Sequence, residues 1–130
     1  MLRTFMNSKI HRATVTESNL NYVGSITISL DLMQSARIGV HELVQVVDID
    51  NGERFETYTI AGEPGLGQIC VNGAAARLVQ LGDKIIIISY AQLTEEEIRT
   101  HRSTVVHVGD YNKIQEIVDH EPANTLYETV

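Results

Sequence analysis

A glycine followed by a serine, Gly24-Ser25, is the pair of residues whose chemistry first stands out. Glycine has no Cβ, so its carbonyl carbon is open to approach, and its backbone accepts strained angles that other residues resist. A serine hydroxyl held in line with that carbonyl can attack it. The dipeptide is common in proteins, so its meaning depends on the residues around it.

A second candidate group consists of cations and hydroxyls on two expected strands. Lys9 and His11 are two residues apart, so in a strand they share a face and could form a cationic pair aimed at an anion. Arg54, Thr57 and Tyr58 lie on one later strand. Arginine holds a carboxylate through two parallel hydrogen bonds, and a tyrosine hydroxyl can transfer a proton. Taken singly, each of these residues is more often an ordinary polar position.

Other kinds of active site find no support in the pattern. The five histidines show no zinc-type spacing, so no metal site is expected. The glycine-rich segment 62–67 lacks the Gly-Lys-Ser/Thr ending of a phosphate loop, and no serine stands in a Gly-x-Ser-x-Gly elbow. The single cysteine, Cys70, has apolar neighbours and is expected to be a small buried side chain.

Composition narrows the class further. The chain has 130 residues, which fits one domain, 1–130, with a net charge of −7. An acidic chain without a Lys/Arg run is not expected to bind nucleic acid. The longest apolar run, Ile85 to Ile88, is far too short to cross a bilayer, so no membrane partner is expected and the protein is expected to be cytoplasmic.

The elements that must position these residues are short and separated by turn signals, which indicates a mainly β fold. The expected strands are 2–7, 11–16, 26–30, 43–49, 54–60, 84–91 and 103–108. Asn51-Gly52 between two β-branched runs predicts a hairpin, and the isoleucine run predicts a strand buried on both faces. Asp31 is expected to cap a helical turn over 31–36, and Thr94 with Glu97 to form a capping box.

Further features complete the expected outline. Segment 74–78 should form a short helix, and the tail from 119 to 130, which lacks periodicity, is expected to be mobile. Periodicity alone leaves a β-sandwich and a closed barrel both open.

Five motifs in this order resemble the bacterial aspartate decarboxylase family over residues 2–112. They are Lys9-Ile10-His11-Arg12, Tyr22-Val23-Gly24-Ser25-Ile26-Thr27-Ile28, Asn51-Gly52-Glu53-Arg54-Phe55-Glu56-Thr57-Tyr58, Ile69-Cys70-Val71-Asn72-Gly73-Ala74-Ala75-Ala76, and Gly82-Asp83. Ser29, Asp50 and Ser103 depart from residues common in the family at those positions.

The resemblance implies a double-psi β-barrel with short helices, assembled as a homotetramer. It also implies a precursor that cleaves itself between Gly24 and Ser25 into chains 1–24 and 25–130, with Ser25 becoming a pyruvoyl cofactor. The pyruvoyl ketone would form a Schiff base with L-aspartate and act as an electron sink, which yields β-alanine for pantothenate synthesis. Whether a maturation factor assists the cleavage is open on the sequence alone.

Residue roles follow from the same resemblance. Ser25 supplies the cofactor, Thr57 is associated with processing, and Tyr58 is the expected proton donor. Substrate contacts are expected from Lys9, His11, Arg54, Asn72 and the segment Gly73, Ala74 and Ala75, with Tyr22 packed beside the cleaved peptide. Two cations suit a dianion, which fits aspartate and does not exclude glutamate.

Two rival hypotheses stand beside this one. The first is a pyruvoyl enzyme that acts on another amino acid. The second is a non-catalytic β-barrel that binds a ligand or a partner, in which Ser25 is an ordinary turn residue.

Overall fold

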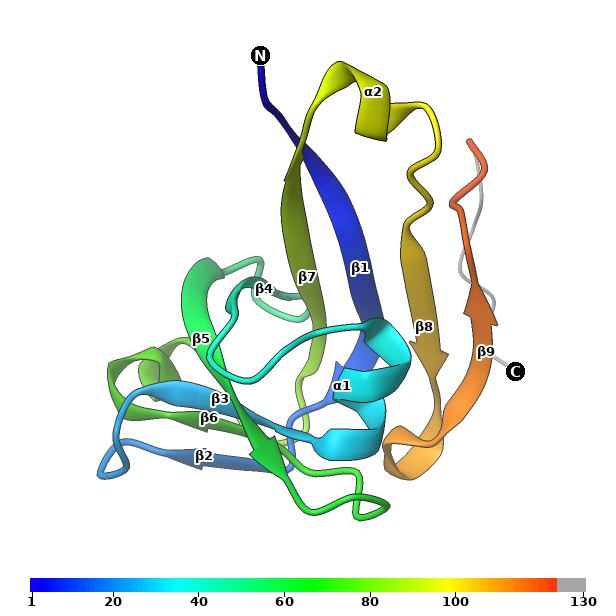
Figure 1. Cartoon of the computed structure of the whole chain (residues 1–130). Helices are drawn as coiled ribbons and strands as arrows, with labels where there is room; N and C mark the ends of the chain where they lie inside the picture. Colours follow the sequence, from blue (N-terminus) through cyan, green and yellow to red (C-terminus); the bar gives the residue numbers. More distant parts are fainter. Residues whose placement is uncertain (124–130) are drawn as a thin grey trace.

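A computed structural model describes residues 1–123 of the chain (Figure 1). Nine strands and short helices succeed one another along it. The strands are β1 (Arg3–Thr14), β2 (Glu17–Asn19), β3 (Ser25–Ser29), β4 (Leu43–Asp48), β5 (Arg54–Gly62), β6 (Ile69–Asn72), β7 (Lys84–Leu93), β8 (Thr104–Val108) and β9 (Ile114–Val118). The helices are α1 (Leu30–Ala36), η1 (Gly73–Leu78), α2 (Glu95–Ile98) and η2 (Asp110–Asn112), of which η1 and η2 are 3₁₀.

The strands form a closed barrel because the short connection between β1 and β2 is hydrogen-bonded to a neighbouring segment on each side. Their order is β2-β6-β3-β5-β4-β7-β1-β8-β9, and β2 follows β1 after only Val15 and Thr16. Val15 N donates to Asp83 O at 2.9 Å and Thr16 N to Ile69 O at 2.8 Å, so this stretch bonds to neighbours on both sides. Strands β1 to β7 therefore close on themselves, and β8 and β9 extend the sheet beyond β1.

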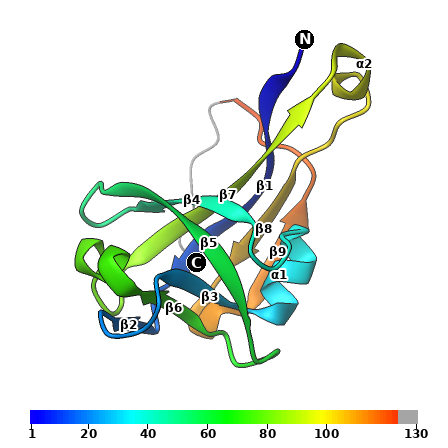
Figure 2. The same ribbon diagram turned by 60° about the vertical axis from the view of Figure 1, so that its left-hand side comes forward.

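Alternating apolar residues fill the interior. Ile10 of β1 pairs with Ile87 of β7, and Ile26 and Ile28 of β3 meet Val71 and Ile69 of β6. All of these are fully buried. Burying each such side chain contributes roughly 1.5–3 kcal/mol. Helix α1 covers the barrel beside β8, as Figure 2 also shows, and adds Leu32 and Met33 to the core.

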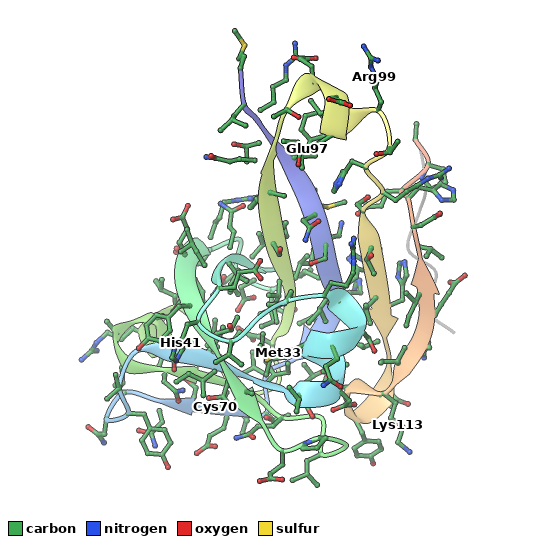
Figure 3. All side chains as sticks on the ribbon, in the orientation of Figure 1. Met33, His41, Cys70, Glu97, Arg99 and Lys113 are labelled. Atoms are coloured by element: carbon green, nitrogen blue, oxygen red, sulfur yellow. The ribbon has the colours of Figure 1, made fainter. Side chains whose placement is uncertain are left out.

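The long strands β1 and β7 run antiparallel and project from the barrel with α2 at their tip. At this tip the capping box expected of Thr94 and Glu97 is confirmed: Glu97 N donates to Thr94 Oγ1 at 3.2 Å, and Thr94 N to a Glu97 carboxylate oxygen at 2.9 Å. Figure 3 shows Glu97 and Arg99 at this end and Cys70 at the opposite end. The tip therefore lies away from the strand that contains Ser25.

Several expectations are confirmed and others are wrong. The Asn51-Gly52 hairpin joins β4 and β5 as predicted. The two strands predicted over 2–7 and 11–16 are one, β1, because a bulge with Arg12 at φ 64° bends the strand without ending it. The isoleucine strand is buried on one face: Ile85 and Ile87 are inside, whereas Ile86 and Ile88 are half-buried.

The start of α1 also differs from the prediction. Ser29, not Asp31, is the N-cap residue, and the helix begins at Leu30. The Asp31 carboxylate instead accepts hydrogen bonds from Ser29 Oγ at 2.7 Å and from Gly65 N at 2.9 Å. It therefore joins the start of the helix to the loop after β5. Of the tail expected to be mobile, only residues 119–123 fall within the described part.

Candidate active site

Ser25 is the first residue of β3, which lies between β5 and β6. The antiparallel register places Ser25 opposite Asn72, the last residue of β6. Residues directly opposite in a sheet point to the same face. Ser25 is fully buried and Asn72 is 4% exposed, so the two side chains meet below the protein surface.

The Asn72 side chain is held from two sides. Its amide nitrogen donates to Ser25 Oγ at 3.1 Å and to Thr27 Oγ1 at 3.2 Å. Its carbonyl oxygen accepts from Cys70 Sγ at 2.9 Å. This fixes the amide orientation, so the Ser25 hydroxyl oxygen has a donor aimed at it. Ser25 Oγ also lies 3.4 Å from Val23 O, at the outer limit of a hydrogen bond.

Gly73 is the glycine that the site requires. Its φ is +68°, a conformation that side chains disfavour. A Cβ on Gly73 would lie 2.6 Å from Gly24 Cα and 2.9 Å from Gly24 N, which are backbone atoms that cannot rotate away. The backbone at Gly73 thus packs directly against the backbone at Gly24. We call this close contact the Gly73 cradle, and a single methyl group on Gly73 would not fit in it.

Gly24 does not have the strained backbone that the sequence suggested. A Cβ there would meet nothing within 4 Å, and its φ lies outside the positive region. Neither space nor backbone strain therefore explains glycine at position 24. The argument from strained backbone applies to Gly73 instead.

Strand β5 brings Thr57 and Tyr58 beside the same peptide. The parallel register pairs Ile26 with Thr59, and extending it toward the start of β3 sets Tyr58 level with Ser25 and Thr57 level with Gly24. Tyr58 is 37% exposed. Its ring packs edge-to-face against the ring of His41, with the two ring centroids 6.0 Å apart. A hydroxyl from each residue is thus placed on the strand next to the one that begins with Ser25.

Lys9 and His11 lie elsewhere, on the outer face of β1. The Lys9 side chain is only 14% exposed, and its Nζ pairs with Glu121 Oε1 at 2.7 Å. The rings of His11 and His107 pack edge-to-face, with their centroids 5.3 Å apart. Burial, and then the charge of Lys9, lowers the pKa of His11 to about 4, so this imidazole is neutral at pH 7. The expected cationic pair therefore contributes one cation, Lys9.

Arg54 lies apart from Lys9 and His11, on a different strand. It opens β5, four residues before Tyr58, and its Nη1 donates to Gln45 Oε1 at 2.8 Å, which also accepts from Tyr90 Oη at 2.7 Å. Within residues 1–123, no hydrogen bond or ion pair links Arg54 or Lys9 to Ser25, Asn72 or Tyr58. The structure thus brings Ser25, Asn72 and Tyr58 together and leaves the cations Lys9 and Arg54 apart from them.

The remaining predicted residues lie around the Gly24–Ser25 peptide. In η1, Ala74 is exposed and Ala75 is half-buried against the core. Tyr22 is 54% exposed, and its carbonyl oxygen faces the Gly73 cradle. Val23 beside it is 79% exposed, so the two residues form an apolar surface next to Gly24-Ser25.

Two residues that hold Asn72 were not singled out for the site. Thr27 gave no signal beyond its alternation with isoleucine, and Cys70 was expected only to be buried. That expectation is confirmed, since burial raises the pKa of the Cys70 thiol to about 11 and makes it a poor nucleophile. Cys70 and Asn72 are two residues apart on β6 and share a face of that strand, so alternation along β6 was the signal that could have found this contact.

Comparison with known proteins supplies the family. The aspartate decarboxylase model matches residues 1–115. This chain belongs to that family. Aspartate 1-decarboxylase of Neisseria meningitidis is 57% identical over 97% of this chain and 99% of its own length. The enzymes of the same name from Caldicellulosiruptor saccharolyticus and Caldicellulosiruptor bescii are 62% and 64% identical, over 93% and 89% of this chain and 94% and 91% of their own.

The mainly β fold with short helices that the family resemblance implied is confirmed by the strands themselves. Among solved structures, a computationally designed double-psi β-barrel protein is similar at a TM-score of 0.38 and 16% identity, covering 68% of this chain and all of its own. No helix within residues 1–123 is long and apolar enough to cross a membrane.

Proposed function

We propose that Ser25 becomes the catalytic group of this aspartate decarboxylase, after the chain cleaves itself into 1–24 and 25–130. The family is pyruvoyl-dependent, and its reaction converts L-aspartate to β-alanine, the precursor used for pantothenate. Family membership decides against the non-catalytic barrel. The observation that supports Ser25 is its buried hydroxyl, which receives the Asn72 amide beside a cradle that only glycine allows.

Cleavage begins when Ser25 Oγ attacks the Gly24 carbonyl carbon. The peptide C–N bond breaks as the new C–O bond forms, so the acyl group moves from nitrogen to oxygen and gives an ester. Loss of the Ser25 Cα proton then expels the Gly24 carboxylate and leaves a dehydroalanine. One water hydrolyses its imine form to a ketone and releases ammonia. The Asn72 amide orients Ser25 Oγ for the first step.

Thr57 has a defined task in this scheme. At the register level of Gly24, its hydroxyl can donate to the oxyanion that develops on the Gly24 carbonyl oxygen. Replacing Thr57 with valine keeps the shape and removes the donor. We expect cleavage to slow by about 100-fold or more, the usual effect of losing one oxyanion donor.

The measurement is the fraction of full-length chain over time after denaturing separation. Thr57→Ser, which restores the hydroxyl, is expected to cleave within about tenfold of the wild-type rate. Equal rates for the valine variant and the wild type would remove Thr57 from the processing step.

The same residues fit the mature cofactor. The pyruvoyl group would lie at the position of Ser25, held beside the Asn72 amide and the Gly73 backbone, and it supplies a ketone that draws electrons from the bond to the departing carboxylate. Tyr58, level with Ser25 on β5, returns a proton to the substrate carbon. Ala74, which is exposed, and Ala75 have short side chains and add little bulk beside the site.

A homotetramer explains why the cations lie apart from Ser25 in one protomer. Lys9 and Arg54 would meet the Ser25 site of a neighbouring copy, where they bind the two substrate carboxylates, with His11 as a neutral hydrogen-bonding group. The exposed apolar residues around the cleavage site, Leu20, Tyr22 and Val23, with Val40 and Leu43, favour such an assembly. The cytoplasmic location stays a prediction, and whether a maturation factor assists the cleavage stays open.

The Glu121 carboxylate forms an ion pair with Lys9, as a substrate carboxylate would. If Lys9 binds aspartate, Glu121 competes with the substrate for the Lys9 ammonium group. Glu121→Gln is therefore expected to lower KM for L-aspartate by roughly 3- to 10-fold and leave kcat nearly unchanged, because a partly exposed ion pair is worth about 1 kcal/mol.

Steady-state β-alanine production checks this effect. Glu116→Gln, which removes another exposed carboxylate from the same end of the chain, serves as the control. An unchanged KM in Glu121→Gln would show that Glu121 does not compete.

The function itself is tested by incubating the processed protein with L-aspartate, L-glutamate or cysteine sulfinate. Release of β-alanine from aspartate, with much slower turnover of the other two acids, is the expected result. Equal or faster turnover of glutamate would overturn the substrate assignment, and no turnover of any of the three by fully cleaved protein would overturn the roles given to the site residues.

A further inference from the structure

Three carboxylates meet where the turn between β4 and β5 reaches the start of β7. Asp48 ends β4, Asp50 lies in the turn and Asp83 precedes β7, and one oxygen from each lies within 4.8 Å of the others. We propose that these three residues bind a divalent cation of the calcium type. The sequence predicted no metal site, and this one is separate from the residues assigned to decarboxylation.

Asp48 provides the observation that calls for a ligand. The residue is fully buried. Its Oδ1 accepts hydrogen bonds from Asp50 N at 2.8 Å and from Asn51 N at 3.3 Å, whereas its buried Oδ2 has no hydrogen-bond partner when both Asp48 and Asp83 are ionised. A buried carboxylate oxygen without a partner is costly, so native structures rarely keep one. A cation bound at Oδ2 would satisfy it.

The other two carboxylates are already oriented. Asp50 Oδ2 accepts from Lys84 N at 2.9 Å, and Asp83 Oδ2 accepts from Gln80 N at 2.9 Å. Each backbone donor fixes one oxygen and leaves the other available to a ligand. A site whose ligands are held in place loses little conformational entropy when the ion binds.

No side chain neutralises this concentration of negative charge. Within residues 1–123, none of the three carboxylates forms an ion pair with a lysine, arginine or histidine. The nearest lysine in sequence, Lys84, directs its Nζ to Thr14 Oγ1 instead. Like charges in contact repel one another, so a bound cation would remove a cost that the protein otherwise carries.

The ligand set suits calcium better than magnesium. Calcium accepts a flexible arrangement of carboxylate oxygens and waters, whereas magnesium demands near-ideal octahedral geometry and dehydrates reluctantly. Three carboxylates from separate segments match the less demanding ion. Waters would complete the coordination on the side of Asp50, which is exposed.

A proton on Asp48 or Asp83 would compete with the cation for this site. Two ionised carboxylates are both acceptors, so Asp48 and Asp83 can bond directly only when one of them is protonated. Burial, and then the contact with Asp83, raises the pKa of Asp48 to about 6. Binding is therefore best measured near pH 7.5, where Asp48 is mostly ionised.

A bound cation would join the hairpin turn that precedes Arg54 to the segment that follows η1. Asn51 Nδ2 already donates to Leu78 O at 2.8 Å across this junction. The ion would add a second link there. Because it binds the folded state, it is expected to raise the temperature of unfolding in proportion to the logarithm of its concentration.

The test uses the processed protein after chelation and removal of the chelator. Calorimetric titration with CaCl2 at pH 7.5 is expected to give a Kd of about 10⁻⁴–10⁻³ M, the range of weak calcium sites, with MgCl2 at least about tenfold weaker. Asp50→Asn and Asp83→Asn, whose amide oxygens still accept the backbone hydrogen bonds, are each expected to weaken calcium binding by about tenfold or more.

Asp110→Asn removes an exposed carboxylate on η2 and is the control, with wild-type binding expected. Asp50 is exposed, so its variant is expected to fold even if that of Asp83 does not. The proposal is overturned if the wild type shows no heat and no rise in unfolding temperature up to about 10 mM calcium, roughly ten times the weakest expected Kd. It is equally overturned if Asp50→Asn and Asp110→Asn bind calcium alike.

Discussion

Replacing Gly73 with alanine is expected to stop self-cleavage almost completely and to destabilise the fold. The alanine must adopt φ near +68°, which costs roughly 1–2 kcal/mol. Its Cβ would also lie 2.6 Å from Gly24 Cα, so the peptide to be cleaved must move. A displacement of about 1 Å at a reacting group reduces a rate by about 100-fold, and we expect at least that loss in the rate of cleavage.

Gly65→Ala separates the two causes. Gly65 has φ +82°, yet a Cβ there meets nothing within 4 Å, so this variant carries the backbone cost without the contact. It should unfold at a lower denaturant concentration than the wild type and still cleave at the wild-type rate. Chain separation on a denaturing gel measures cleavage, and urea titration measures stability. If Gly73→Ala cleaves as fast as Gly65→Ala, the close approach to Gly24 has no role in processing.

Ser25→Ala is expected to remove both cleavage and β-alanine production, to below about one part in 10⁴ of wild type, because the attacking oxygen and the source of the ketone are both lost. The fold should persist, since the change removes one buried hydroxyl that accepts a single hydrogen bond from Asn72. Far-ultraviolet circular dichroism and thermal unfolding are expected to match the uncleaved wild type closely.

Ser18→Ala is the matched control for that experiment. Ser18 lies on β2, beside β6, and its hydroxyl donates to Ala76 O at 3.1 Å, so a hydroxyl near η1 is lost without touching the peptide to be cleaved. This variant is expected to cleave and to produce β-alanine normally. Residual β-alanine from an uncleaved Ser25→Ala chain would show that a residue other than Ser25 supplies the catalytic group.

Local signals in the sequence predicted the parts of the fold that local physics decides. The Asn51-Gly52 hairpin and the Thr94–Glu97 capping box both depend on neighbouring residues, and both are present. Three strands, β2, β6 and β9, were not predicted. Strands β2 and β6 are only three and four residues long, and β9 is mostly exposed and lacks strict alternation. The pairing of β2 with β6 and of β9 with β8 is a property of the barrel.

The candidate site divides in the same way. Ser25 and Asn72 were identified through family motifs, but their contact spans 47 residues of sequence and follows from the register of β3 and β6. The role of Gly73 also depends on that register, which is why glycine strain was assigned to Gly24 instead. The separation of Lys9 from Ser25 could not be foreseen, because it reflects how many strands lie between β1 and β3.

The central claim, that the chain cuts itself at Gly24–Ser25 and makes its own cofactor, is tested most directly by the intact mass of the purified protein under denaturing conditions. Two chains are expected in place of one of 14.5 kDa: residues 1–24 ending in a carboxylate, and residues 25–130 beginning with a pyruvoyl group in place of Ser25. A single full-length chain that stays whole after prolonged warming, and that still makes β-alanine, would contradict the account.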